Sequence, residues 1–367
     1  MADVYFANLR ARSHHESKIQ KIRRLFDAAG LGEVVRPGDL TVVKLHVGER
    51  GCDTYLHPVF ARQVVDKVKE RGARPFITDT ATLYAGSRAD AVGHTVTAIE
   101  HGFAYAVAGA PVIVADGLSG GYWREVAVDG KHFRSVRIAG SILDADSMII
   151  LSHVKGHDTA GVGGAIKNLG MGCAPPSGKA EQHAARPCLE GENCIGCGRC
   201  TLVCPQAAMT VVEGKALFNP EHCVGCGDCV RACPEGAIDF DWTTEIRPFL
   251  ERLCEYALGA VRGKPGRVGY INFLLNITPD CDCLPWSDAA IVPDIGILAS
   301  TDPVAIDRAS IDLINGQQGF AGTHLAANLA PGEDKFKGVW DYTDDDYQIA
   351  YAAAIGLGEA VYRLIEV

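Results

Sequence analysis

The chain has 367 residues, of which 47% are hydrophobic and 22% charged, so it has room for one large α/β domain or two ordinary ones and is not a disordered chain. Its net charge of −10 argues against nucleic acid as the main partner. The sequence contains no run of about 18 apolar residues, which predicts no membrane span, and its polar N-terminus does not have the form of a signal peptide, which predicts a cytoplasmic protein.

Short β-branched runs alternate with helical stretches along the first half of the chain. Strands are expected at residues 40–47, 74–80, 111–116 and 147–153. An amphipathic segment at 58–72 predicts a helix closed by Gly72, and Asp129–Gly130 predicts a hairpin turn. This alternation predicts an α/β fold in which helices flank a largely parallel sheet.

Polar side chains follow four of the expected strands, and ligands of parallel sheets bind beyond the carboxyl ends of strands. These side chains are Lys44, His46 and Glu49 after the first strand, Asp79, Thr80, Thr82, Tyr84 and Arg88 after the second, His153, Lys155 and His157 after 147–153, and Ser300, Thr301 and Asp302 after a strand within 291–301. We expect the four ends to converge. His153, Lys155 and His157 share one face of an extended chain and are the candidates for proton delivery. The alternative is that each is a satisfied structural group.

The glycine-rich segment 159–172 precedes a short helix that carries Lys167. Exposed N–H groups at Gly163 and Gly164, together with Lys167 and Lys44, predict a site for an anion such as a substrate carboxylate or phosphate. The segment matches neither a Walker A motif nor a dinucleotide fingerprint. Close packing of the helix on the sheet is the alternative. The Pro/Gly/Ala-rich stretch 172–187 is expected to be irregular.

Fourteen cysteines without an export signal predict metal ligands rather than disulfides. Eight of them lie in two C-x2-C-x2-C-x3-C-P repeats, in which three thiolates hold one cluster and the fourth holds the other. One [4Fe-4S] cluster is therefore assigned to Cys194, Cys197, Cys200 and Cys233, and the other to Cys223, Cys226, Cys229 and Cys204. Structural zinc sites are the alternative, but they do not need this third spacing or the terminal proline.

The repeats closely resemble bacterial-type two-cluster ferredoxins, which implies one-electron transfer at low potential. The domain plan that follows is an α/β domain at 1–185, a ferredoxin-type insert at 186–241, and the second part of the α/β domain at 242–367. Residues 188–240 hold three basic and seven acidic side chains, which favours a basic redox partner protein, although ordinary solubility explains the charge equally well.

The segment TPDCDCLPW places Cys281 and Cys283 in a C-x-C pair. Two thiolates with His46, or with another histidine of the strand ends, would bind a further metal ion of soft character. A redox dithiol and simple burial of two small thiols are the alternatives.

Three long segments, LSHVKGHDTAGVGGAIKNLGMG, TPDCDCLPW and DIGILASTDPVAIDRASIDL, together resemble the DUF362 family of iron–sulfur proteins. The resemblance covers nearly the whole chain and implies that the C-x-C pair belongs with the HVKGH segment and that the ferredoxin unit is an insert. It implies no substrate, because no general activity is established for the family.

These patterns lead to one functional prediction and one alternative. The prediction is an oxidoreductase that passes low-potential electrons through two [4Fe-4S] clusters to a substrate or metal in the α/β cleft. A polar, strand-end cleft favours this enzyme, since a simple carrier does not need one. The alternative is a non-enzymatic electron carrier or a metallocentre-assembly factor that docks a partner protein.

Overall fold

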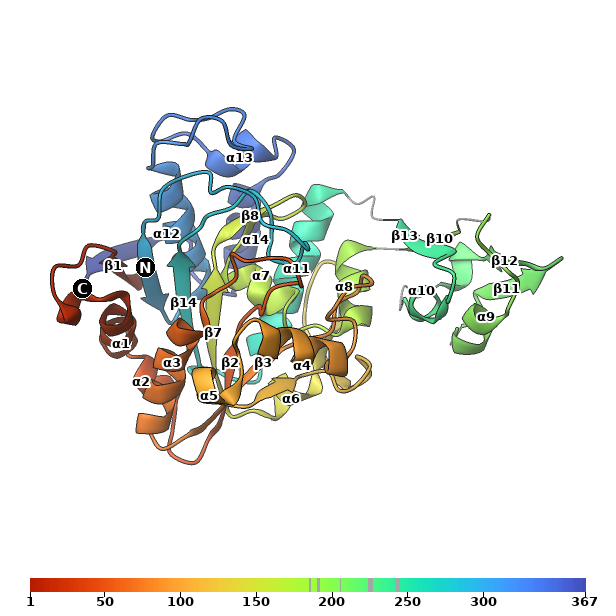
Figure 1. Ribbon diagram of the computed structural model, residues 1–367, viewed down its shortest axis with the longest axis horizontal. Helices are drawn as coiled ribbons and strands as arrows, with labels where there is room; N and C mark the ends of the chain where they lie inside the picture. Colours follow the sequence, from red (N-terminus) through yellow and green to blue (C-terminus); the bar gives the residue numbers. More distant parts are fainter. Residues whose placement is uncertain (185, 190–191, 205, 224–226, 242–244) are drawn as a thin grey trace.

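The computed structural model describes residues 1–184, 186–189, 192–204, 206–223, 227–241 and 245–367, and its centre is an eight-stranded sheet in the order β16-β1-β15-β14-β7-β2-β3-β4 (Figure 1). The strands of this sheet are β1 (Ala2–Asn8), β2 (Leu40–Lys44), β3 (Arg74–Asp79), β4 (Val112–Val114), β7 (Ser147–His153), β14 (Val268–Leu274), β15 (Gly296–Ser300) and β16 (Tyr362–Glu366). The predicted α/β fold with a mostly parallel sheet and flanking helices is confirmed.

Strand β15 departs from the expected topology. All other neighbouring strands of the sheet run parallel, but β15 is antiparallel to both β1 and β14. Ser300 at its end therefore pairs with Tyr270 near the start of β14. The prediction that Ser300, Thr301 and Asp302 would join the other strand ends is wrong, because the reversed strand carries them to the opposite edge of the sheet.

The central strands are buried on both faces, which explains their continuous apolar sequences. In β7, Met148 and Ile150 belong to one hydrophobic core, while Ile149 and Leu151 belong to the other. The first core is closed by α6 (Gly140–Asp144), α7 (Ala165–Gly170), α11 (Ile246–Val261), α12 (Pro303–Asn315), α13 (Lys335–Val339) and α14 (Asp345–Ala354). The second is closed by α1 (Lys18–Ala28), α2 (Leu31–Val34), α3 (Pro58–Glu70), α4 (Ala91–Glu100) and α5 (Tyr105–Ala108).

Helices and turns with a strong local sequence pattern lie where the sequence predicts them. The helix expected at 58–72 is α3, and the expected hairpin joins β5 (Trp123–Ala127) to β6 (Ser135–Ala139). The stretch 172–187, expected to be irregular, instead contains helix α8 (Pro176–His183), which begins at a proline in its first turn. In the described ranges, no helix combines the length and the apolar character needed to cross a bilayer.

The segment 186–241, called the insert below, interrupts the α/β fold between α8 and α11 and lies to one side of the sheet (Figure 1). Its described elements are β10 (Arg186–Leu189), α9 (Arg199–Val203), β11 (Met209–Val212), β12 (Lys215–Phe218), α10 (Asp228–Ala232) and β13 (Ile238–Asp241). Strand β10 pairs with β13 and β11 pairs with β12, both antiparallel. A two-stranded ribbon that joins the two ends of the insert, and one hairpin within it, thus form its frame.

Candidate functional site

A cavity of about 130 Å³ opens where β2, β3 and β7 end, beside the loop that follows β14. Its lining includes the predicted residues Lys44, His46, Asp79, Thr80, Thr82, Tyr84, Arg88, His153, Lys155, His157, Gly163, Gly164, Lys167, Cys281 and Cys283. Three of the four predicted strand ends therefore converge, together with the C-x-C pair. The cavity and the side chains around it are called the pocket below.

The buried pair of Lys44 and Asp79 forms one wall of the pocket. Lys44 Nζ lies 2.9 Å from Asp79 Oδ1 and donates to Asn168 Oδ1 at 2.8 Å. Burial opposes ionisation of Asp79, but Lys44 and the other cations beside it hold the pKa of this carboxyl well below its usual range. Lys44, which the sequence predicts to neutralise a bound anion, is thus already neutralised by the protein itself.

Arg88 is fully enclosed and organises the second strand end. Its Nε lies 3.1 Å from Glu49 Oε2, and its Nη2 donates to the Tyr84 hydroxyl at 2.6 Å. That hydroxyl donates in turn to the carbonyl of Cys283 at 2.7 Å. Burial alone would lower the pKa of Arg88, but Tyr84, Asp79 and Glu49 raise it. This charged network therefore supports the C-x-C loop from one side.

His153 supports the same loop from the other side. Its Nδ1 lies 2.9 Å from Asp282 Oδ2, and its Nε2 donates to the carbonyl of Leu275 at 2.8 Å. Both ring nitrogens are used by protein acceptors, although the ring lines the pocket. The geometry therefore gives this predicted catalytic residue a positioning role.

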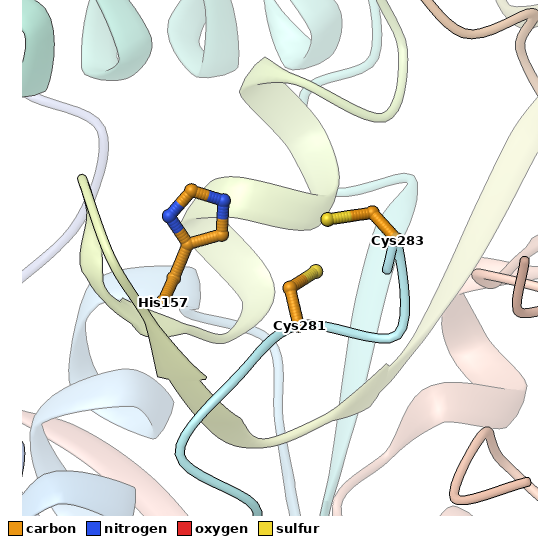
Figure 2. Close-up of side chains that lie close together, drawn as sticks. All are labelled: His157, Cys281 and Cys283. Carbon is orange, nitrogen blue, oxygen red and sulfur yellow. The ribbon is translucent and has the colours of Figure 1, made fainter. Parts of the chain in front are cut away.

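Lys155 and His157 lie on strand β8 (Lys155–His157), which pairs with β9 (Gly161–Gly163) in a hairpin. Lys155 Nζ donates to the carbonyl of His153 at 2.8 Å and lies 3.2 Å from Asp282 Oδ2. Burial alone would lower the pKa of Lys155, but Asp282 and Cys281 raise it. His157 does not contact Asp282 and turns instead towards the two cysteines (Figure 2).

The C-x-C pair forms the floor of the pocket. The side chain of Lys167, from α7, reaches Cys281 Sγ at 3.3 Å. The hydrogen bond from Cys283 and the nearby Lys167 and Lys155 hold the pKa of Cys281 well below its ordinary value. The same contact, together with burial, raises the pKa of Cys283 well above its ordinary value. The pair is therefore disposed to hold one thiolate and one thiol.

Of the strand-end histidines that the sequence offers as ligands beside the C-x-C pair, with His46 as the first choice, His157 lies next to the two cysteines. Donor atoms of His157, Cys281 and Cys283 all lie within 4.8 Å of one another. His46 lines the pocket but is not part of this group, and its Nδ1 accepts the N–H of Gly48 at 3.0 Å. The two cysteines and His157 thus lie together, whereas His46 lies elsewhere in the lining of the pocket.

Directly after the predicted Gly163 and Gly164, two N–H groups of the glycine-rich turn have a partner within the protein. The N–H groups of Ala165 and Ile166, at the start of α7, donate to Asp307 at 2.7 and 2.8 Å. A carboxylate from α12 therefore occupies the anion position that the turn offers. Gly163 and Gly164 line the pocket, and a Cβ on Gly164 would lie only 2.4 Å from Asp307 Oδ1, so only glycine lets this carboxylate approach the turn so closely. Among the predicted anion-binding side chains, Lys44 is paired with Asp79, whereas Lys167 forms no ion pair with a carboxylate in the described residues.

Several residues of the pocket were missed by the sequence analysis, namely Leu83, Leu151, Ser152, Asn168, Met171, Gly172, Lys179 and His183. Lys179 is the most telling of them. It lies on α8, in the stretch expected to be irregular, and donates to Thr80 Oγ1 at 2.5 Å and to the carbonyl of Ala81 at 2.6 Å. Burial lowers its pKa to about 8. Lys179 could have been predicted as a pocket residue only if the segment 176–183 had been recognised as a helix.

In the insert, the four cysteines assigned to one cluster line a common cavity. They are Cys194, Cys197, Cys200 and Cys233. Two of their sulfur atoms accept backbone N–H groups, Cys194 from Ala216 and Cys233 from Ala237, both at 3.3 Å. Such bonds suit thiolates that carry a metal cluster.

The second set of cysteines is described in part. Cys204 Sγ accepts the N–H of Ala208 at 3.1 Å, and Cys229 is buried on α10. Cys223 precedes this helix, while Cys226 lies outside the described residues. The described members are therefore compatible with the predicted set without completing it.

Fold and site together define an α/β protein with a mostly parallel sheet and a cation-rich, thiol-containing pocket at its strand ends. A family model described as "Domain of unknown function (DUF362)" matches residues 41–312, so the chain belongs to this family.

Two further comparisons found more distant similarity. The "Thylakoid-associated protein sll1697" of Synechocystis sp. (strain ATCC 27184 / PCC 6803 / Kazusa) is 28% identical over 180 residues, which are 48% of this chain and 52% of that protein. The chain thus spans about half the length of this curated relative. The lactate racemase apoprotein from Thermoanaerobacterium thermosaccharolyticum is 10% identical with a TM-score of 0.38, covering 75% of this chain and 51% of that one, a likeness too slight to support any argument.

Proposed function

We propose that this protein is an iron–sulfur oxidoreductase that delivers low-potential electrons from two [4Fe-4S] clusters in the insert to a small anionic substrate or a metal in the pocket. The clusters would supply single electrons. The residues of this chain would hold the clusters, bind the substrate and move protons.

The arrangement of the cysteines supports the first part of the proposal. Four thiols of the repeats surround one cavity, and backbone N–H groups point at two of their sulfur atoms. The remaining cluster would be held by Cys204, Cys223 and Cys229 with Cys226. The acidic character of the insert suits a basic redox partner protein.

The observation that carries the proposal is the contact between the insert and the pocket. Leu83 lines the pocket and also packs with Phe240 of the insert in a small apolar cluster. A Cβ on Gly227 would lie only 3.2 Å from Leu83 Cδ1, so the chain of the insert passes close to this side chain. Gly227 stands in sequence between Cys226 and Cys229. Gly227 and Val230, on either side of Cys229 in the sequence, therefore belong to the part of the insert that meets the wall of the pocket.

The side chains of the pocket divide into two groups. His153 and Lys155 are held by Asp282, and Lys44 by Asp79, so these residues position the wall of the pocket. Lys167 and His157 face the space beside the C-x-C pair. Lys167 is available to hold negative charge, and His157 is available to exchange a proton as long as it holds no metal ion.

An anaerobic reoxidation experiment tests the proposal. The full chain is expected to carry about eight irons, as two [4Fe-4S] clusters require. After reduction with dithionite and its removal, the low-molecular-weight fraction of an anaerobic cell extract should reoxidise the clusters, monitored by their electron paramagnetic resonance signal. Cys283→Ser should keep its iron and lose this reoxidation, whereas Cys188→Ser, an exposed cysteine outside the repeats, should behave as the wild type.

Two results would decide against the proposal. Far fewer than about eight irons per chain would remove the clusters on which it depends. Full iron with reoxidation unchanged in Cys283→Ser would leave the alternative of a carrier or assembly factor whose α/β domain binds a protein.

A further inference from the structure

Three side chains of the pocket bring potential metal-ligand atoms close together. The sulfur atoms of Cys281 and Cys283 and the imidazole of His157 face one another, with all three donor atoms within 4.8 Å (Figure 2). They come from two segments more than 120 positions apart in the chain, so local sequence does not bring them together. Thiolate and imidazole are the donors that borderline and soft cations prefer.

We propose that Cys281, Cys283 and His157 bind one zinc-like cation, with a fourth coordination position open to the pocket. Three protein ligands and one open position are the arrangement of catalytic rather than structural zinc sites. Binding of the cation is independent of the iron–sulfur clusters. A role for the cation as the place where electrons or substrate are received rests on the function proposed above.

The two cysteines are held in place before any ion binds. Cys281 and Cys283 lie in a tight turn, which is closed by a hydrogen bond from the N–H of Leu284 to the carbonyl of Cys281 at 3.1 Å, and both cysteines line the pocket. Asp282 is fixed by His153 and Lys155, and its carbonyl accepts the N–H of Glu49 at 2.8 Å. At Gly156, where the N–H donates to the carbonyl of Thr278, a Cβ would strike Pro279 O at 2.1 Å, which explains how the loop packs so closely on β8.

The surroundings of His157 explain why it is the ligand in place of His46. A histidine that binds a cation through Nε2 needs a proton on Nδ1 and an acceptor for that proton. Asp158 Oδ1 lies 2.9 Å from His157 Nδ1 and provides this acceptor. The N–H groups of Thr159 and Ala160, both at 3.1 Å, favour the other tautomer in the metal-free chain, so binding must shift the proton. His46 Nδ1 likewise accepts an N–H, from Gly48, but among the described residues this ring has no carboxylate partner like Asp158.

The charges around the trio indicate what fills the fourth position. A divalent cation with two thiolates is neutral in sum, and Lys155 is balanced by Asp282. Lys167 contacts Cys281 Sγ and forms no ion pair with a carboxylate in the described part of the chain. Its positive charge is therefore left beside the open position, which suits a small anion such as a carboxylate.

Zinc binding to the cluster-loaded full chain tests the inference. The anaerobic protein is treated with a mild chelator and then dialysed against buffered Zn²⁺, and zinc and iron are counted on the same sample. We expect one zinc per chain in addition to the iron. Cys283→Ser and His157→Gln should each weaken zinc binding at least about tenfold, and Asp158→Asn about tenfold through the loss of the proton acceptor.

Matched controls separate this site from adventitious binding. His46→Gln removes a histidine from the same pocket and Cys188→Ser removes an exposed cysteine; neither should change the zinc affinity. The inference is overturned if the iron-loaded chain takes up no zinc, if His46→Gln costs as much affinity as His157→Gln, or if alkylation mass spectrometry finds a Cys281–Cys283 disulfide in the anaerobic protein. One zinc that is lost in Cys283→Ser, in a chain poor in iron, would support the site while contradicting the iron–sulfur proposal.

Discussion

Asp282 joins the two sides of the pocket through a single carboxylate. Its oxygens lie 2.9 Å from His153 Nδ1 and 3.2 Å from Lys155 Nζ, and all three side chains are buried. Burial opposes ionisation of Asp282, but His153 and Lys155 hold its pKa well below the usual range. The carboxylate is thus the counter-charge that allows a lysine to stay charged inside the protein.

We expect Asp282→Ala to destabilise the protein strongly, because it leaves Lys155 without a counter-charge in a buried position. Removing one partner of a buried ion pair costs about 3 to 5 kcal/mol, and the free energy of unfolding measured by anaerobic chemical denaturation should fall by that order. Asp280→Ala is the matched control two residues away. Asp280 is only partly buried and makes no ion pair in the described residues, so a change within about 1 kcal/mol is expected. Equal losses in both variants would contradict the role given to Asp282.

The sequence predicts well which residues line the pocket, but it predicts poorly what role each of them has there. The SHVKGHD segment places His153, Lys155 and His157 near a strand end, and the structure finds all three in the pocket. Their partners decide their roles, and these partners lie far away in the chain. His153 is held by Asp282 and the Leu275 carbonyl, which no local pattern could reveal. The choice of His157 over His46 beside the cysteines depends on the same long-range packing.

Helix α7 owes its position to a carboxylate on another helix. Asp307 of α12 accepts the N–H groups of Ala165 and Ile166 and the side-chain amide of Asn272 at 2.7 Å. Burial raises the pKa of Asp307 to about 6, so the carboxylate is mostly ionised at neutral pH. Because α7 carries Lys167, this internal cap fixes the one lysine of the pocket that contacts Cys281.

We expect Asp307→Ala to lower the free energy of unfolding by about 3 kcal/mol or more, because three buried donors lose their acceptor. Asp307→Asn keeps one acceptor and should lose less. Asp312→Ala, on the exposed side of the same helix, removes a surface pair with Arg308 and should cost no more than about 1 kcal/mol. Denaturation of the three variants under one buffer provides the comparison. A loss in Asp312→Ala as large as in Asp307→Ala would show that general damage to α12 is the cause.

Elements with strong local patterns were predictable, and those defined by distant pairing were not. The apolar run at 147–153 coincides with β7, and α3 begins and ends close to the expected bounds. The direction of β15 is set by its neighbours β1 and β14, which the sequence pattern does not encode. Strand β14 itself, seven buried residues before the C-x-C loop, was not predicted, although it sets the position of that loop.

At the scale of the whole molecule, the contact between the insert and the α/β part determines whether the insert stays beside the pocket. The apolar contact consists of Leu83 and Ala180 from the α/β part and Phe240 from the insert, with Val230 packed against them. Leu83 and Phe240 are both almost fully buried. Loss of a buried phenylalanine side chain typically costs about 3 to 5 kcal/mol. A contact made of so few side chains does not stay closed after a loss of that size. The insert should therefore detach from the pocket when either side of the contact is cut back.

We expect Phe240→Ala and Leu83→Ala each to speed limited proteolysis between the α/β part and the insert by at least about tenfold, which corresponds to about 1.4 kcal/mol of lost contact. The double variant should show little further increase, because the two side chains belong to one interaction. Iron content should stay unchanged in all three, since the predicted ligands are intact. Leu202→Ala, an 85% exposed leucine of the insert, should cleave like the wild type. Additive effects of Leu83→Ala and Phe240→Ala would mean that these side chains do not act together, and the link between insert and pocket would lose its support.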